Sequence, residues 1–165
     1  REDGVREVEY GFEYTESLST RLMEPWFISL LANTKMRFGE LDEAAEWIAR
    51  AHASITESGT NFALPAVYCL DGELRLNEAY GGYDRDAAYI AFTRGVEVAR
   101  SHGSRALEAQ ALYGALRSRR DHAEEQIALE QLRACLEVFT PGEDSQDIAG
   151  PIALVESYES ATDVT

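Results

Sequence analysis

The stretch DRDAAYIAFTRGVEVARSHG, residues 84–103, decides the fold of this chain. Within it, Ala88, Phe92 and Gly95 are spaced by four and then three residues, so they lie on one face of a helix. Small side chains at both ends of this triplet let a neighbouring helix approach closely, and the large side chain fills the space between them. Gly103 is expected to end the helix, because glycine readily adopts the left-handed conformation found after helices.

The same small–large–small triplet occurs on both sides of this stretch. The other copies are Ala44, Ile48 and Ala51, and Ala128, Leu132 and Cys135. The three copies begin 44 and then 40 residues apart, compared with about 34 residues in a tetratricopeptide unit. Alanine is common at helix contacts in any helical bundle. The prediction of a repeat therefore rests on the identical spacing of all three triplets. We predict an all-α, tetratricopeptide-like solenoid of three helical hairpins and a closing C-terminal helix.

Glycine and proline fall between amphipathic segments, which predicts helices along most of the chain. The predicted helices span residues 24–38, 41–57, 64–80, 84–102, 104–120 and 122–139, with a last helix from about residue 144. Pro151 is expected to kink or restart that last helix. In the first helix of each hairpin a small residue is again expected where the two helices cross. These residues are Ala32, Gly72 and Gly114. Residues 1–20 form an acidic, frayed lead-in, and residues 21–165 form one helical domain.

The composition limits the classes of partner. The chain has 165 residues, with 30 acidic against 15 basic side chains and a net charge of −15. Nucleic acids and anionic membranes attract basic surfaces, so neither is an expected partner of this chain alone. No apolar run approaches the roughly 20 residues needed to span a bilayer. Cys69 and Cys135 lie far apart in apolar helical runs, which indicates buried, reduced thiols and a cytoplasmic location.

The sequence contains no motif that supports catalysis. The phosphate-binding Gly-x-x-x-x-Gly-Lys-Ser/Thr loop, the dinucleotide fingerprint and the Gly-x-Ser-x-Gly elbow are all absent. His52, His102 and His122 have no Cys or carboxylate partners at metal-ligand spacing. We therefore expect this chain not to be an enzyme, and we expect no cofactor or metal.

One segment departs from the acidic average, because residues 94–120 hold six arginines and only two acids, Glu97 and Glu108. Ala99, Gly103 and Ala109 also fit helix-turn-helix spacing. This segment is the basis of the alternative hypothesis, a DNA-binding regulator. Against it, the recognition helix would begin ALEA, which is poor in base-reading side chains. The basic segment could equally receive acidic residues of another copy by self-association.

The inner face of a tetratricopeptide-like stack is lined by the first helix of each hairpin, and it is the predicted binding groove. Its predicted binding residues are Trp26, Asn33, Arg37, Glu73, Asn77, Glu108 and Arg119. Ser29, Cys69 and Ala111 belong to the same predicted face. A mixed lining of this kind suits a peptide or a small polar ligand. The alternative is a concave surface that is merely solvated.

Three segments resemble a bacterial family, namely Asp71–Leu76 (DGELRL), Val96–Arg100 (VEVAR) and Phe139–Asp147 (FTPGEDSQD). The last is similar to the family ending Phe-Thr-x-Gly-x-Asp-Thr-x-Asp. The family is the C-terminal tetratricopeptide-like region of signalling ATPases, which are often fused to adenylate cyclase or to winged-helix transcriptional activator domains. The chain departs from the family pattern at Tyr80–Tyr83 and at Asp121-His122.

The resemblance implies a protein-interaction or effector-sensing module of a larger bacterial signalling or transcriptional regulator. It implies a protein or peptide partner, and it places any catalytic domain outside this chain.

Overall fold

The computed structural model describes residues 6–7, 10–11, 22–118, 122–139 and 146–162. The described residues are organised as an all-α chain whose consecutive helices pack as neighbours, as predicted. The helices are α2 (Glu24–Phe38), α3 (Leu41–Ser58), α4 (Leu64–Leu76), α5 (Arg85–His102), α6 (Arg105–Ser118), α7 (His122–Leu136) and α8 (Gln146–Thr162). The predicted lead-in, residues 1–20, lies outside the described residues except for 6–7 and 10–11.

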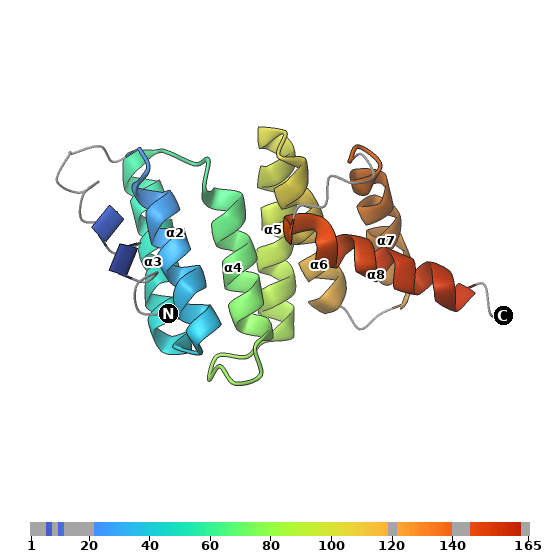
Figure 1. Cartoon of the computed structure of the whole chain (residues 1–165), viewed down its shortest axis with the longest axis horizontal. Coiled ribbons are helices and arrows are strands. Elements are labelled where there is room, and N and C mark those ends of the chain that lie inside the picture. Colours follow the sequence, from blue (N-terminus) through green and yellow to red (C-terminus); the bar gives the residue numbers. More distant parts are fainter. Residues whose placement is uncertain (1–5, 8–9, 12–21, 119–121, 140–145, 163–165) are drawn as a thin grey trace.

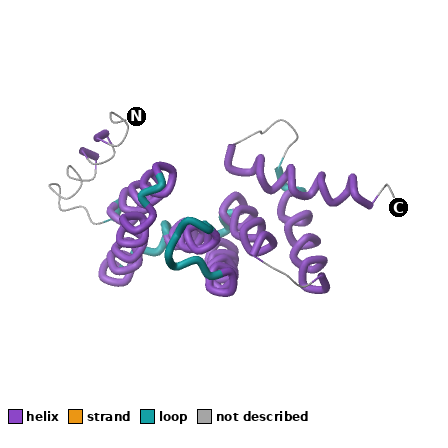
Figure 2. Tube along the Cα trace, turned by 90° about the horizontal axis from the view of Figure 1, so that it is seen from below, coloured by secondary structure: helices purple, strands orange, loops and turns teal. Residues whose placement is uncertain are grey.

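The helices are arranged in antiparallel pairs, α2 with α3, α4 with α5, and α6 with α7 (Figure 1). The first helices also contact one another, since α4 packs against both α2 and α6. Within the described part of the chain, by contrast, α3 does not contact α5, and α5 does not contact α7. The first helices therefore form a continuous layer. Helix α8 packs against α6 and α7, and Figure 2 shows it at the C-terminal end of the molecule.

The local signals place most helix ends correctly. Helices α2, α3 and α5 are followed by Gly39, Gly59 and Gly103, whose φ angles are 76°, 69° and 68°. Such positive φ angles cost glycine little, which is why glycine ends helices well. The Asp84 carboxylate caps α5 by accepting hydrogen bonds from the backbone N–H groups of Asp86 and Ala87.

Two predicted helix features are corrected by the structure. Helix α4 ends at Leu76 and not at Tyr80, because Asn77 is extended and its side-chain oxygen accepts the N–H of Ala79 at 3.0 Å. This local turn competes with the helix for backbone hydrogen bonds. Helix α8 continues through Pro151, so of the two predicted outcomes, a kink or a restart, the restart is wrong. Pro151 is buried, so packing holds the helix together where one backbone hydrogen bond is missing.

The recurring triplets form the contacts between helices. Their members are buried in the first two copies, and Leu132 and Cys135 are buried in the third, where Ala128 is half-buried. Core clusters join α2 and α3 to α4, and α4 and α5 to α6 and α7. The core therefore runs along the molecule from pair to pair and is not concentrated at one centre.

Phe92 occupies the tightest of these contacts. Its ring is fully buried between Gly72 of α4 and Gly114 of α6. A Cβ atom on Gly72 would lie 2.6 Å from the ring, and one on Gly114 would lie 2.2 Å from it. Both distances are far inside van der Waals contact, so only glycine fits on either side. The predicted crossing residues Gly72 and Gly114 therefore hold α5 between its two neighbours.

Candidate functional site

A groove of about 580 Å³ is formed by the first helices. Helix α2 contributes Trp26, Ser29, Leu30 and Asn33, α4 contributes Ala66, Cys69, Leu70 and Glu73, and α6 contributes Ala106, Leu107, Gln110 and Tyr113. Gly150 and Pro151 of α8 close one side, and part of Phe92 reaches the floor. We call this hollow the inner groove.

Helical periodicity places these side chains in the inner groove. Trp26, Leu30 and Asn33 follow one another at intervals of four and three residues, so they form one stripe along α2. Cys69 and Glu73 form the equivalent stripe on α4, four residues apart. Because α2 and α4 contact each other directly, the two stripes become adjacent walls of the groove.

The walls are mainly apolar, with a few polar groups. Glu73 accepts a hydrogen bond from Nη1 of Arg117 at 2.7 Å, which pairs α4 with α6. The Arg117 guanidinium also lies over the Tyr113 ring, 5.0 Å from its centroid. The Asn33 side chain makes no hydrogen bond to any described residue. An unpaired amide beside apolar walls can donate to and accept from a peptide backbone.

Trp26 is the most prominent apolar group at the groove. It is 43% exposed, and its neighbour Leu30 is 36% exposed. The Ser29 hydroxyl donates to the Trp26 carbonyl at 2.7 Å, so it is directed toward its own helix. Exposed tryptophan next to a pocket is typical of residues that anchor a partner.

Six of the seven predicted binding residues fall into three groups. Trp26, Asn33 and Glu73 line the inner groove together. Arg37 and Asn77 lie outside it, because Arg37 is exposed in the last turn of α2 and Asn77 is turned into the loop after α4. Arg119 lies outside the described residues.

Glu108 was predicted to line the groove, but it is not among the residues of the inner groove. It is only 3% exposed, and its two oxygens accept from Nε of Arg100 at 2.6 Å and from Nη1 of Arg105 at 2.9 Å. Burial raises the pKa of Glu108, but the hydrogen bonds from the two arginines outweigh burial and hold that pKa below its usual value. Glu108 is therefore a structural anion that joins α5 to the start of α6.

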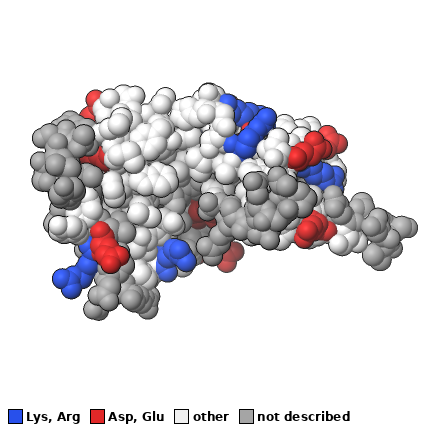
Figure 3. Space-filling model, turned by 45° about the horizontal axis from the view of Figure 1, so that its top comes forward, with Lys and Arg blue, Asp and Glu red and all other residues white. Residues whose placement is uncertain are grey.

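This cluster also bears on the basic segment 94–120. Arg100 and Arg105 share Glu108, and Arg117 is paired with Glu73. Figure 3 shows blue atoms enclosing a small area of red on the upper edge of the molecule, about midway along its length. Ala106 and Leu107, which a DNA-reading helix would direct outward, line the inner groove instead. Three of the six arginines of this segment therefore form ion pairs within the fold.

Several residues that line the inner groove were missed by the prediction from sequence. Leu30, Leu70 and Leu107 have a usable signal, since each lies within one or two helical turns of a predicted groove residue or crossing position. Gly150 and Pro151 have none, because only the packing of α8 against α6 brings them to the groove.

The two thiols are buried, as predicted, and neither forms a disulfide. Burial raises the pKa of Cys69 to about 12 and the pKa of Cys135 to about 11. Both are therefore protonated and unreactive at neutral pH. No cluster of three His, Cys, Asp or Glu side chains suited to a metal ion occurs among the described residues. The helices described here are also too short or too polar to cross a membrane.

No family model, curated protein or solved structure matches this chain. What is established is the architecture: an all-helical domain built of adjacent antiparallel helix pairs, with α8 packed against the last pair.

Proposed function

We propose that this domain is a protein-interaction or effector-sensing module of the tetratricopeptide-like kind, and that the inner groove binds a peptide or small polar ligand. The observation that carries the proposal is the convergence of Trp26, Asn33 and Glu73 on one groove formed by the first helix of each pair. Side chains from three successive pairs can contact an extended ligand at several points along its length.

The chemistry of the groove favours a peptide over a purely polar ligand. Exposed Trp26 and Leu30 provide apolar area, while the Asn33 amide provides a donor and an acceptor for a backbone. Glu73, already paired with Arg117, adds little net charge. Recognition in the groove would thus depend on shape and hydrogen bonds more than on net charge.

The proposed setting is a larger bacterial signalling or transcriptional regulator, as the resemblance of DGELRL and FTPGEDSQD to such proteins implies. Binding in the inner groove would favour one arrangement of the helix pairs, and so one arrangement of a fused domain. A ligand has this effect only if it binds the two arrangements with different affinity.

Peptide selection with a displayed random library, followed by titration of a synthetic selected peptide, tests the proposal. Trp26 and Trp47 are the two tryptophans, so Trp47→Phe leaves Trp26 as the fluorescent reporter inside the groove. Trp26→Ala, assayed by calorimetry, should weaken binding by about 2 kcal/mol or more, roughly 30-fold. Asn33→Ala should weaken it by about fivefold, the value of one hydrogen bond.

Arg37→Ala is the matched control, because Arg37 lies on the same helix as Asn33 but outside the groove. It should leave peptide affinity unchanged. Selected peptides that bind Trp26→Ala as tightly as the wild type would overturn the assignment of the groove.

A further inference from the structure

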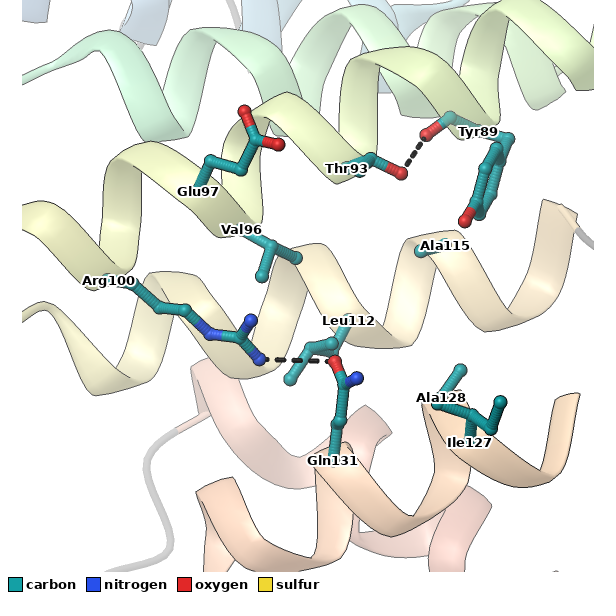
Figure 4. Close-up of a pocket in the computed structure, with 10 residues that line it drawn as sticks. All are labelled: Tyr89, Thr93, Val96, Glu97, Arg100, Leu112, Ala115, Ile127, Ala128 and Gln131. Carbon is teal, nitrogen blue, oxygen red and sulfur yellow. Dashed lines mark hydrogen bonds between the residues drawn. The ribbon is translucent and has the colours of Figure 1, made fainter. Parts of the chain in front are cut away.

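A second pocket lies on the other side of α6, between α5 and α7 (Figure 4). Its volume is about 320 Å³, at the small end of the range of ligand sites. Val96, Leu112 and Ala115 form a buried apolar floor, and Ala128 adds to it from α7. We call it the outer pocket. It shares no lining residue with the inner groove.

Arg100 places a positive charge at one end of the outer pocket. Its Nε is held by the buried carboxylate of Glu108 at 2.6 Å, and its Nη2 donates to Oε1 of Gln131 at 3.2 Å. These two contacts fix the guanidinium in one position before any ligand binds. The side chain is still 46% exposed, so its remaining N–H groups can reach a ligand.

The ion cluster of Arg100, Arg105 and Glu108 carries one net positive charge, which Glu97 in the pocket lining balances overall, so the positive charge is local to the Arg100 guanidinium. Glu108 neutralises one of the two arginines that share it, Arg100 and Arg105. Glu97 is the acidic residue in the pocket lining, and Figure 4 shows its carboxylate directed away from the Arg100 guanidinium. A fixed guanidinium binds a carboxylate through paired, charge-assisted hydrogen bonds.

We propose that the outer pocket binds a small amphiphilic carboxylate, with its acid group on Arg100 and Gln131 and its apolar tail on Val96, Leu112 and Ala115. The volume limits the tail to a short chain or single ring. The apolar floor supplies affinity, and the fixed guanidinium selects for the acid group over a neutral one.

Titration calorimetry with octanoate, hexanoate and 1-octanol tests this directly, at an ionic strength of about 0.15 M, where the Debye length is about 8 Å. Octanoate should bind more tightly than hexanoate, by about fourfold for each added methylene. Octanoate should also bind about tenfold more tightly than 1-octanol, the effect of a charged hydrogen bond. Equal binding of octanoate and 1-octanol would overturn the role of Arg100.

Arg100→Met and Arg105→Met form a matched pair of variants. Each removes one positive charge and one of the two partners of Glu108, but only Arg100 lines the pocket. Arg100→Met should reduce octanoate affinity by about tenfold, and Arg105→Met should leave it unchanged. Comparable urea midpoints would show that both variants are folded to the same extent, and an equal loss of affinity in both would refute the proposal.

Ala128→Phe tests the apolar end without touching any charge. Ala128 is half-buried at the rim of the floor, so a larger side chain can occupy the pocket itself. Loss of octanoate binding in this variant is the expected result. Undiminished binding would place the fatty chain elsewhere and overturn the proposed site.

Discussion

At the scale of single residues, the contact between Phe92 and two glycines sets the distance between three helices. A Cβ atom at position 114 would lie 2.2 Å from the Phe92 ring, and one at position 72 would lie 2.6 Å from it. The ring is fully buried between the two glycines, so a shift away from one brings it closer to the other. A single methyl group here must therefore shift helices and not only side chains.

Gly114→Ala should lower the free energy of unfolding by about 1–3 kcal/mol or more, as overpacked cores do. Urea unfolding followed by circular dichroism measures the loss. Phe92→Leu in the same chain should recover part of it, because the smaller side chain makes room. Gly81→Ala is the control and should be close to neutral, since a Cβ atom there has no neighbour within 4 Å. Wild-type stability in Gly114→Ala would contradict the described packing.

Glu108 gives a residue-scale prediction that depends on pH. Glu108→Gln should lower the free energy of unfolding near neutral pH by about 1.5–3 kcal/mol, because hydrogen bonds to a charged group are lost. The pKa of Glu108 is lower in the folded chain. Its stabilisation is therefore complete above the unfolded pKa, about 4.3, and is lost as the pH falls through the folded pKa.

Urea titrations over a pH series should show the wild type and Glu108→Gln converging in acid, where the carboxyl group is protonated. Glu97→Gln on α5 is the control, because Glu97 is exposed and outside this ion-pair cluster. A stability difference that does not change with pH would contradict the role given to Glu108.

At the scale of elements, two aspartates near helix starts have different roles. Asp84 caps α5 with hydrogen bonds of 3.0 Å and 2.9 Å to the N–H groups of Asp86 and Ala87. Asp42 lies inside the first turn of α3, and Glu40 occupies the cap position without a side-chain bond.

Asp84→Ala should therefore cost about 1 kcal/mol of stability, the usual value of a cap. Asp42→Ala should cost only a few tenths, because an exposed acid in the first turn acts through the helix dipole alone. Thermal unfolding of the two variants in parallel compares them. Equal destabilisation would mean that the Asp84 bonds add nothing to α5.

At the scale of the whole molecule, the net charge of −15 opposes compaction. Lys35 of α2 pairs with Glu40 and Glu43, and Arg117 of α6 pairs with Glu73 of α4, but the chain has twice as many acidic as basic side chains. Raising the NaCl concentration from about 0.01 M to about 1 M shortens the Debye length from about 30 Å to about 3 Å. The melting temperature should rise over this range, and a fall would show that ion pairs outweigh repulsion.

The sequence by itself determined the helices and their main contacts. Helix ends at Gly39, Gly59 and Gly103 and the register of the triplet around Phe92 depend on residues within a few positions of one another. The same short-range periodicity places Trp26 and Asn33 on one face of α2, and Glu73 joins them because α4 packs against α2.

Tertiary structure alone decided the rest, because it depends on residues far apart in the chain. From the sequence alone Glu108 is indistinguishable from a surface residue. It is buried because Arg100 and Arg105 both pair with it at the α5–α6 turn. Pro151 reaches the inner groove only because α8 packs back against α6. The outer pocket likewise exists only once α5 and α7 lie on either side of α6, so no spacing within a single helix could predict it.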